Sequence, residues 1–410
     1  MDSPKDIQID SYDYPLPSER IAQRPLARRD ACKLLVWRGG DISEVVFSDL
    51  PAILPEGSVL VYNNTRVINA RLRFKKDTGA AIEVFCLEPY SPADYAQSFA
   101  ASSECEWVCF VGNSKKWKEG KLKTAITVDG REISLSAERI AQNGNAWIIR
   151  FSWDGGVTFS EVIAAAGEIP VPPYLNRPTE AADSVDYQTV YSHIEGSVAA
   201  PTAGLHFTPE VLDEISRRGI PRLEVTLHVG SGTFQPVKSD TIGDHPMHSE
   251  FISVKREVIA ALRDALEGGR PVVAVGTTSV RTLESLYHAG CMMAQGEWHG
   301  EIPQWYPYSE MRPDLSAPDA LGRILEWLEK SGADSFVADT RIIIAPGYRY
   351  KVVGAMVTNF HQPRSTLLLL VSAFTEGDNW RKIYDYALEN GFRFLSYGDA
   401  CILLPFVKNT

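Results

Sequence analysis

Three histidines stand where a side chain could move a proton on a bound molecule. His206, His228 and His361 lie in loops or just after predicted strands, within "GLHFT", "TLHVG" and "TNFHQ". Imidazole gains or loses a proton near neutral pH more readily than other side chains. A single histidine is more often structural, but three in similar settings predict at least one general acid or base. Asp399, in the turn "SYGDA", is predicted to orient that base or to face a cation.

A hydroxyl-rich turn offers a place for a negatively charged group. The stretch "VGTTSVRTLES" (275–285) follows a buried apolar run and opens a helix. The free N–H groups there, together with Thr277, Thr278 and Ser279, suit a carboxylate or phosphate, and Arg281 follows one turn later. Simple capping of the helix by a threonine explains the same residues without a ligand. The further predicted substrate contacts lie in similar turns: Thr202, Gly204, Gly230, Gly232, Asn359, Arg364, Ser365 and Tyr397.

The stretch "GSVAAPTAGLHFT" (196–208) combines very small residues with a histidine. Its glycines and proline interrupt any regular helix or strand. One interpretation is a loop that lies flat against a bulky ligand and directs His206 toward it. A loop packed tightly between two domains explains the small residues equally well.

A metal site is a competing hypothesis. His245, His248 and Glu250, within "HPMHSE", carry side chains that bind zinc. The intervening proline and the irregular spacing disfavour it, so no metal is predicted. A metal-dependent hydrolase that uses these three residues stays open as an alternative.

The elements that must position these residues alternate between helices and strands. Apolar runs such as "SVLVY", "RLEVTL" and "PVVAV" predict strands, and "RIIIAP" (341–346) and "FRFLS" (392–396) are predicted as strands too. "PSERIAQ" (17–23) predicts a helix capped by Ser18. Between them lie short alternating runs with Asp-Gly and Asn-Gly turns, which predict an antiparallel β-domain. The predicted fold is an α/β domain with a mixed sheet (residues 1–68 and 156–410), interrupted by a small all-β, barrel-like insertion (69–155).

The charge of the chain is negative overall but uneven. The 410 residues carry a formal net charge of −11, which by itself disfavours a nucleic-acid partner. Basic runs nevertheless gather in the first third. The N-terminal sequence lacks a signal peptide, apolar runs are too short to span a membrane, and the six cysteines show no disulfide-like spacing. We therefore expect a cytoplasmic protein without membrane contact.

Several long blocks resemble one enzyme family. "YQTVYSHIEGSVAAPTAGLHFT", "HVGSGTFQPV", "VGTTSVRTLES", "VTNFHQPRSTLLLLVSAF" and "FRFLSYGDA" are similar, in this order, to the S-adenosylmethionine:tRNA ribosyltransferase-isomerases of queuosine biosynthesis, and the N-terminal "NNTRVINARL" is similar as well. The resemblance covers nearly the whole chain. It implies transfer and isomerisation of the ribosyl part of S-adenosylmethionine onto 7-aminomethyl-7-deazaguanine in a tRNA anticodon, giving epoxyqueuosine-tRNA, adenine and methionine.

The resemblance implies tRNA and S-adenosylmethionine as partners. Because the sulfonium already acidifies its neighbouring C–H, we expect no cofactor beyond S-adenosylmethionine as co-substrate, and we expect a monomer. The predicted tRNA-binding residues are Arg66, Arg71, Lys75, Lys76, Lys115, Lys116, Trp117 and Lys118, with the indole available to stack on a base. The chain departs from the family pattern at Lys33, Asn64, Ile68-Asn69 and Gly354, and residues 291–339 form a longer connection. These departures leave open a diverged paralogue that binds tRNA without catalysis.

Overall fold

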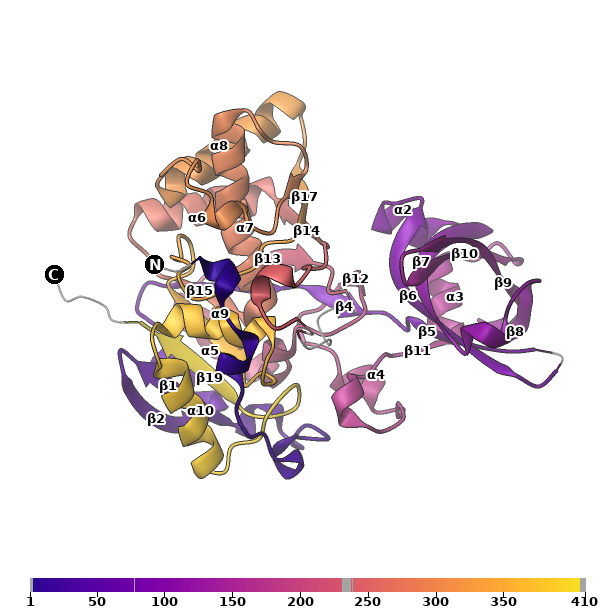
Figure 1. Ribbon diagram of the computed structural model, residues 1–410, viewed down its shortest axis with the longest axis horizontal. Helices are drawn as coiled ribbons and strands as arrows, with labels where there is room; N and C mark the ends of the chain where they lie inside the picture. Colours follow the sequence, from indigo (N-terminus) through magenta and orange to yellow (C-terminus); the bar gives the residue numbers. More distant parts are fainter. Residues whose placement is uncertain (1–2, 77, 231–236, 238, 406–410) are drawn as a thin grey trace. The chain divides into compact units, whose positions relative to one another are not determined.

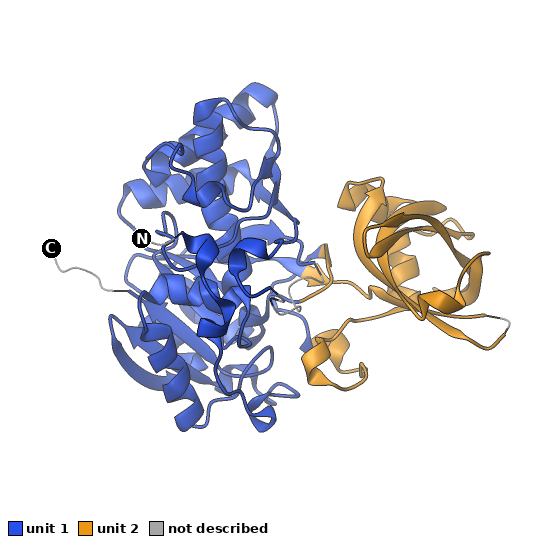
Figure 2. Cartoon of the chain, in the orientation of Figure 1, with its two compact units in different colours: residues 1–65, 186–194, 200–410 blue, residues 66–185, 195–199 orange. Residues whose placement is uncertain are grey.

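The computed structural model describes residues 3–76, 78–230, 237 and 239–405. Contacts divide the chain into two compact units (Figure 2). The larger unit comprises residues 1–65, 186–194 and 200–410, and the smaller one comprises 66–185 and 195–199. The smaller unit therefore extends well beyond the predicted end of the insertion at residue 155.

The larger unit is built on a ten-stranded mixed sheet, as the sequence predicts. Strands β13, β3, β15 and β18 are parallel to one another, whereas β19 is antiparallel to β18 and parallel to β1. In spatial order the strands are β16 (Glu301–Ile302), β17 (Ser335–Thr340), β14 (Glu250–Lys255), β13 (Arg222–Leu227), β3 (Val59–Asn63), β15 (Val272–Val275), β18 (Ala355–Asn359), β19 (Ala400–Leu404), β1 (Lys33–Arg38) and β2 (Asp41–Val46).

Every residue of β3, β15, β18 and β19 is buried. Since side chains of a strand alternate between the two faces of a sheet, both faces are covered. The central helix α7 (Gly276–Gln295) contacts β3, β13, β15 and β18 and is buried along most of its length, with α8 packed against it. The other α-helices of this unit are α1 (Leu50–Ile53), α5 (Pro209–Arg217), α6 (Arg256–Glu267), α8 (Ala317–Ser331), α9 (Thr366–Thr375) and α10 (Asn379–Glu389) (Figure 1).

The smaller unit is a seven-stranded antiparallel sheet that curls around its own core (Figure 1). In spatial order its strands are β11 (Gly167–Glu168), β5 (Arg71–Lys75), β6 (Ala81–Ser91), β7 (Glu104–Gly112), β10 (Ala146–Trp153), β9 (Arg131–Asn143) and β8 (Leu122–Val128). Its end strands share no ladder among the described residues, so the sheet is a half-barrel. The helices α2 (Tyr95–Ala100) and α3 (Phe159–Ala166) belong to this unit, which is therefore not purely β.

The remaining elements join the two units. They are β4 (Thr65–Val67), which pairs with β12 (Ile194–Ser197), and the short helix α4 (Asp183–Asp186). Within the part of the chain that the structure describes, no helix is long and apolar enough to cross a membrane.

Three local predictions are wrong. Residues 17–23 form only a 3-10 turn, Ser18–Arg20, whose N-cap is Pro17. Residues 341–346 are extended and largely buried, but their N–H groups bond to segment 302–308 instead of joining the sheet. Residues 392–396 make a single bridge, between Phe394 and Ile21. The apolar residues of both segments are buried by packing alone, which a strand-like sequence pattern does not reveal.

Candidate active site

The sheet brings several of the predicted residues to one edge. Since β13, β3, β15 and β18 are parallel, their carboxyl ends lie side by side, and His228, Gly276 and Asn359 stand at these ends. Asn359 pairs with Ala400 at the start of the antiparallel β19, so Asp399 lies at the same edge. Ligands of α/β sheets bind outside the carboxyl ends of the strands.

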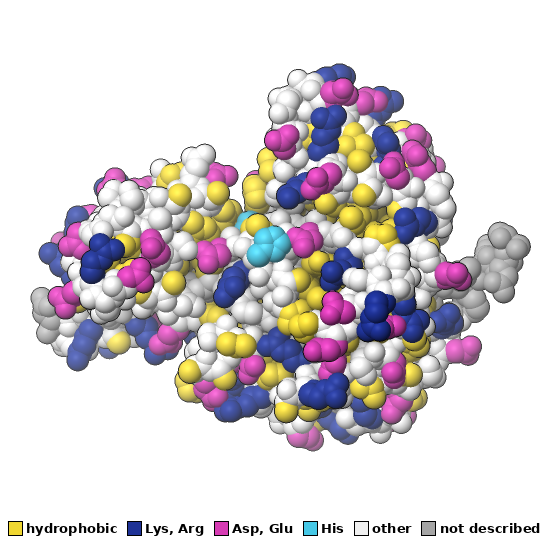
Figure 3. Space-filling view, turned by 180° about the vertical axis from the view of Figure 1, so that it is seen from behind, with side chains coloured by type: hydrophobic (Ala, Val, Ile, Leu, Met, Phe, Trp, Pro, Cys, Tyr) yellow, Lys and Arg dark blue, Asp and Glu magenta, His cyan; other side chains and the backbone are white. Residues whose placement is uncertain are grey.

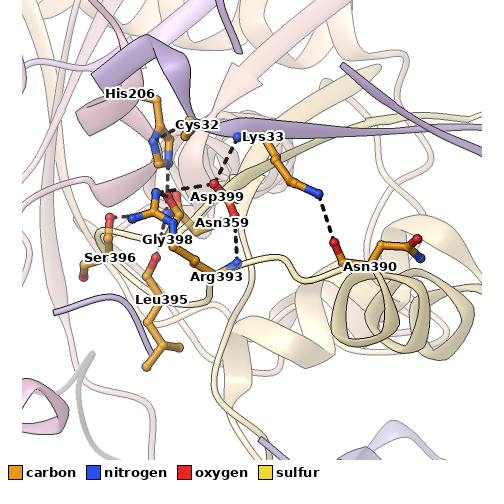
Figure 4. A network of polar contacts seen from close by, with 10 residues as sticks. All are labelled: Cys32, Lys33, His206, Asn359, Asn390, Arg393, Leu395, Ser396, Gly398 and Asp399. Atoms are coloured by element: carbon orange, nitrogen blue, oxygen red, sulfur yellow. Dashed lines mark hydrogen bonds and ion pairs between the residues drawn. The ribbon is translucent and has the colours of Figure 1, made fainter. Parts of the chain in front are cut away.

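His206 is buried at this edge, at the end of a short 3-10 helix, and both of its ring nitrogens have partners (Figure 4). Its Nε2 lies 3.1 Å from the Nδ2 of Asn359 and its Nδ1 3.3 Å from the Sγ of Cys32. The Asn359 amide nitrogen also donates to the carbonyl of Leu395 at 2.9 Å, which fixes its orientation. His206 Nε2 is therefore an acceptor, and its proton lies on Nδ1, toward the sulfur.

Burial keeps His206 neutral. Desolvation lowers its pKa to about 4, and the positive charges of Arg393 and Arg29 act in the same direction. Burial also raises the pKa of the Cys32 thiol, with a further contribution from Asp399, so this thiol is neutral too. The Oδ1 of Asn359 is buried and has no hydrogen-bond partner among the described residues. The site therefore holds a neutral base next to an unused acceptor.

Asp399 binds three groups of the protein itself (Figure 4). Its Oδ1 accepts the backbone N–H of Lys33 at 3.0 Å, and its Oδ2 accepts that of Arg393 at 2.7 Å. The Arg393 guanidinium lies 3.4 Å from Oδ1. Asp399 thus ties the start of β1 to the turn before β19 and positions Arg393. A small pocket beside this cluster is lined by Pro25, Leu26, Arg29, Cys32, Leu205, His206, Arg393, Ser396, Tyr397 and Gly398.

The other two histidines lie at separate strand ends. His361 is buried, and its Nε2 lies 2.9 Å from the Oγ1 of Thr358. Its carbonyl accepts a hydrogen bond from Tyr14, and burial lowers the pKa of its imidazole to about 4. His228 follows β13, and its ring stacks on Phe251 with 5.7 Å between centroids. Among the described residues the three histidines therefore have different partners and do not form one hydrogen-bonded cluster.

The start of α7 differs from a simple side-chain cap. The helix begins at Gly276, and neither predicted threonine is its N-cap. Ser279 donates its hydroxyl back to the carbonyl of Val275 at 2.7 Å, which occupies it within the helix. The Oγ1 of Thr278 is buried and lacks a hydrogen-bond partner in the described part of the chain. The buried hydroxyl of Thr278 therefore has room in its hydrogen bonding for a ligand.

Packing explains why one residue of the stretch 196–208, Gly204, is small. A Cβ atom at Gly204 would lie 2.0 Å from the Oη of Tyr191 and 2.7 Å from a methyl of Thr189. Thr202 opens the 3-10 helix that carries His206. The residue at 204 must be glycine because a tyrosine occupies the space, whether or not a ligand binds nearby.

Three further predicted contacts have different surroundings. The hydroxyl of Ser365 caps α9 by accepting the N–H of Leu368. Arg364 pairs with Asp10 at 3.0 Å, and Gly230 has open space around it. Gly232 lies outside the described residues.

The basic residues of the smaller unit lie in β4, in and just after β5, and in and around the 3-10 turn Ser114–Lys116. The Nζ of Lys76 donates to the carbonyl of Lys116 at 3.1 Å, so two basic runs distant in sequence meet. Lys75, Lys115, Lys116, Lys118 and Arg66 are exposed, whereas Glu83 lies 3.6 Å from Arg71. On the face shown in Figure 3, Lys and Arg side chains are interspersed with Asp and Glu.

The prediction that Trp117 stacks on a base is not supported by its position. Its side chain is fully buried, and its Nε1 donates to the carbonyl of Gly120 at 2.8 Å. The guanidinium of Arg139 lies 4.8 Å from the centre of its ring. Trp117 anchors the lysine-bearing turn from inside the core and has no face free for a base.

The structure describes all three residues of the alternative metal site, His245, His248 and Glu250. Over the residues that the structure describes, no group of three or more His, Cys, Asp or Glu side chains could hold a metal ion. Glu250 instead forms a buried ion pair with Arg281.

Sequence reasoning missed Cys32, Arg393 and Arg29 as members of the site. Cys32 is buried, and its sulfur also faces His206. Arg29 belongs to the basic run 20–30, whose charge alone gives no sign that one of its residues lines this pocket. The position of Arg393, six residues before Asp399, was the one available signal, since a short turn allows the carboxylate to bind the backbone of Arg393.

Comparisons with known proteins cover almost the whole chain. The family described as "Queuosine biosynthesis protein" matches residues 9–403. The chain belongs to this queuosine biosynthesis protein family. Relatives from Brucella ovis and Brucella melitensis, each called S-adenosylmethionine:tRNA ribosyltransferase-isomerase, are 39% identical over 403 residues, 97% of this chain and of theirs. The S-adenosylmethionine tRNA ribosyltransferase of Thermotoga maritima, a solved structure, is 28% identical over 96% of this chain and 99% of its own, with a TM-score of 0.47.

Two departures from the queuosine family pattern are accommodated locally. Asn64 donates its Nδ2 to Glu224 at 3.1 Å and accepts the hydroxyl of Thr226 at 2.8 Å. An aspartate there would face the carboxylate of Glu224, so the amide suits this neighbour. The longer connection 291–339 includes α8, which packs on α6 and α7 and so belongs to the folded core of the larger unit.

Proposed function

We propose that this chain is an S-adenosylmethionine:tRNA ribosyltransferase-isomerase that acts on 7-aminomethyl-7-deazaguanine in a tRNA anticodon. The observation that carries the proposal is the match to the queuosine biosynthesis family and its named relatives over nearly the full length of both chains. The predicted reaction residues, moreover, lie along one edge of the mixed sheet. The enzyme works as a cytoplasmic monomer and needs no cofactor beyond its co-substrate.

The reaction needs a base and an acid. The sulfonium acidifies the neighbouring C5′–H, so a neutral imidazole can remove that proton. Adenine then leaves from C1′ with the bonding electrons and takes up a proton. The amine of the deazaguanine forms a C–N bond and gives up a proton. The ribosyl carbons close to the epoxycyclopentane, and as the epoxide C–O bond forms the sulfonium C–S bond breaks, so that methionine leaves with its electrons. His206, His228 and His361 form the pool for these proton transfers. The Nε2 of His206 can accept a proton only when the amide of Asn359 no longer donates to this nitrogen. Substrate binding therefore breaks that hydrogen bond and frees the base.

Asp399 and the start of α7 support the substrate. Asp399 acts through Arg393 and the backbone of β1, and is therefore a positioning residue. Thr277 and Thr278 bind polar groups of S-adenosylmethionine near the helix start. The exposed lysines of the smaller unit bind tRNA phosphates and contribute charge rather than base selection.

The test is adenine release from S-adenosylmethionine, with and without tRNA that carries the precursor base, in the wild type and in three variants. His206→Gln, His228→Gln and His361→Gln are made singly, with the exposed His299→Gln as control. We expect release that depends on tRNA, and a loss of roughly 10²- to 10⁴-fold in at least one of the three variants.

Other outcomes would contradict specific parts of the proposed function. Binding of tRNA without adenine release would identify a non-catalytic paralogue, and stoichiometric zinc in protein purified without added metal would revive the hydrolase. Near-normal turnover in all three folded variants would remove the histidines from the chemistry.

A further inference from the structure

A second pocket of the larger unit lies beside α7 and α9, apart from the His206 cluster. It holds about 530 Å³ including its open mouth. Its lining combines apolar residues with charged and polar ones. Its lining residues are His245, Met247, His248, Glu250, Arg281, Ile342, Ile343, Ile344, Thr366, Leu367 and Leu370.

Arg281 is the buried cation of this pocket, and only part of its guanidinium is used. Its Nη1 binds the carboxylate of Glu250, and the side chain is 10% exposed. Its Nε and Nη2 are buried without a hydrogen-bond partner in the described ranges. These two N–H groups lie on the same side of the planar guanidinium, where they form the fork that matches the two oxygens of a carboxylate or phosphate. Leaving such donors unpaired is costly unless a ligand binds them.

The start of α9 adds two further donors to the same pocket. Ser365 caps the helix through the N–H of Leu368. The preceding N–H groups, those of Thr366 and Leu367, have no acceptor within the helix, because the first turn of a helix lacks one. Both residues line the pocket. The positive end of the helix and the Arg281 fork thus favour an anion.

We infer that this pocket binds the carboxylate of an amino-acid chain, held by the Nε and Nη2 of Arg281 and by the start of α9. The apolar residues of the lining, Ile342, Ile344 and Leu370 among them, suit the methylene groups that follow such a carboxylate, whereas a polynucleotide phosphate carries polar sugars on both sides. The inference rests on the proposed function, under which this chain is the methionyl end of S-adenosylmethionine. The carboxylate then binds in this pocket instead of at the hydroxyls of the α7 start.

Two ligands and one variant test whether this pocket binds the carboxylate. Binding of S-adenosylmethionine is compared with binding of its decarboxylated analogue, in the wild type and in Arg281→Lys. Lysine keeps the charge beside Glu250 but cannot present the fork. The wild type should prefer the carboxylated ligand by about 10- to 100-fold, the loss of one charge-assisted pair, and Arg281→Lys should lose most of that preference. Arg323→Lys, at an exposed position of α8, is the control and should keep it.

The outcomes separate this inference from the proposed function. A wild type that binds S-adenosylmethionine while Arg281→Lys keeps the full preference overturns the carboxylate site alone. Weaker tRNA binding in Arg281→Lys with an unchanged ligand preference would assign the fork to a phosphate and overturn it as well. A wild type that binds neither ligand overturns both proposals. If Arg281→Lys fails to fold, the wild-type ratio decides, because equal affinity for the two ligands contradicts the site.

Discussion

At the scale of single residues, buried neutral histidines make the fold sensitive to acid. Burial lowers the pKa of His206 and of His361 to about 4, from an ordinary value near 6.5. Between these two values the unfolded chain binds protons that the folded chain does not. Stability is therefore fully present above pH 6.5 and falls as the pH drops toward 4.

The predicted loss is about 2 kcal/mol for each histidine at pH 5. Urea unfolding at pH 7.5 and pH 5 should show a smaller loss in His206→Gln and His361→Gln than in the wild type. His299→Gln, whose side chain is exposed, should keep the wild-type difference. A wild-type stability that does not change between these pH values would contradict the buried, neutral state of the two rings.

Residue types identified candidates for chemistry, but their contacts could not be predicted. Trp117 sits among lysines in the sequence, and nothing local indicates that the ring turns inward while its neighbours stay exposed. Cys32 and His206 meet across 174 positions. Such pairs form only when the strands are ordered in the sheet, and strand order is not written in any one segment.

At the scale of elements, the loop before His206 tests whether packing fixes small residues. Gly204→Ala would force a methyl group against Tyr191, so we expect a loss of about 1–3 kcal/mol or more in the free energy of unfolding. Adding Tyr191→Phe removes the closest atom and should restore part of it. Gly322→Ala is the matched control, because its Cβ in α8 meets no atom within 4 Å. It should stabilise by up to about 1 kcal/mol.

A contrary result would be equally informative. If Gly204→Ala is as stable as the wild type but loses affinity for S-adenosylmethionine, the glycine serves the ligand and not the packing. Thermal or urea unfolding and calorimetry on the same preparations distinguish the two.

Element type was predictable wherever periodicity and caps agreed. Thr208 and Pro209 start α5 as the sequence indicates, and the alternating runs of the smaller unit became β5 to β10. Segments 341–346 and 392–396 are as apolar as the segments that form strands, but among the described residues no strand pairs with them in a ladder. An apolar pattern indicates which side chains are buried. It does not show whether the backbone of the segment pairs with another strand or is only extended.

At the scale of the whole molecule, a net charge of −11 must be reconciled with an RNA substrate. The exposed Lys115, Lys116 and Lys118 lie near Lys76 in the smaller unit, and none of the three forms an ion pair with a described residue. Binding driven by phosphate contacts depends on where the positive charge is placed, not on the total. We therefore predict that the position of these lysines, and not the net charge, determines tRNA binding.

Replacing Lys115, Lys116 and Lys118 with glutamine should weaken tRNA binding and lower the slope of log affinity against log salt by about 2 to 3, because each lost phosphate contact removes about 0.7 to 0.9. Affinity for S-adenosylmethionine should not change. The control replaces Lys255, Lys330 and Lys382, which are exposed in the larger unit, so the net charge falls equally. Equal effects in both triple variants would mean that total charge governs binding. An unchanged slope in the first would place the RNA-binding surface elsewhere.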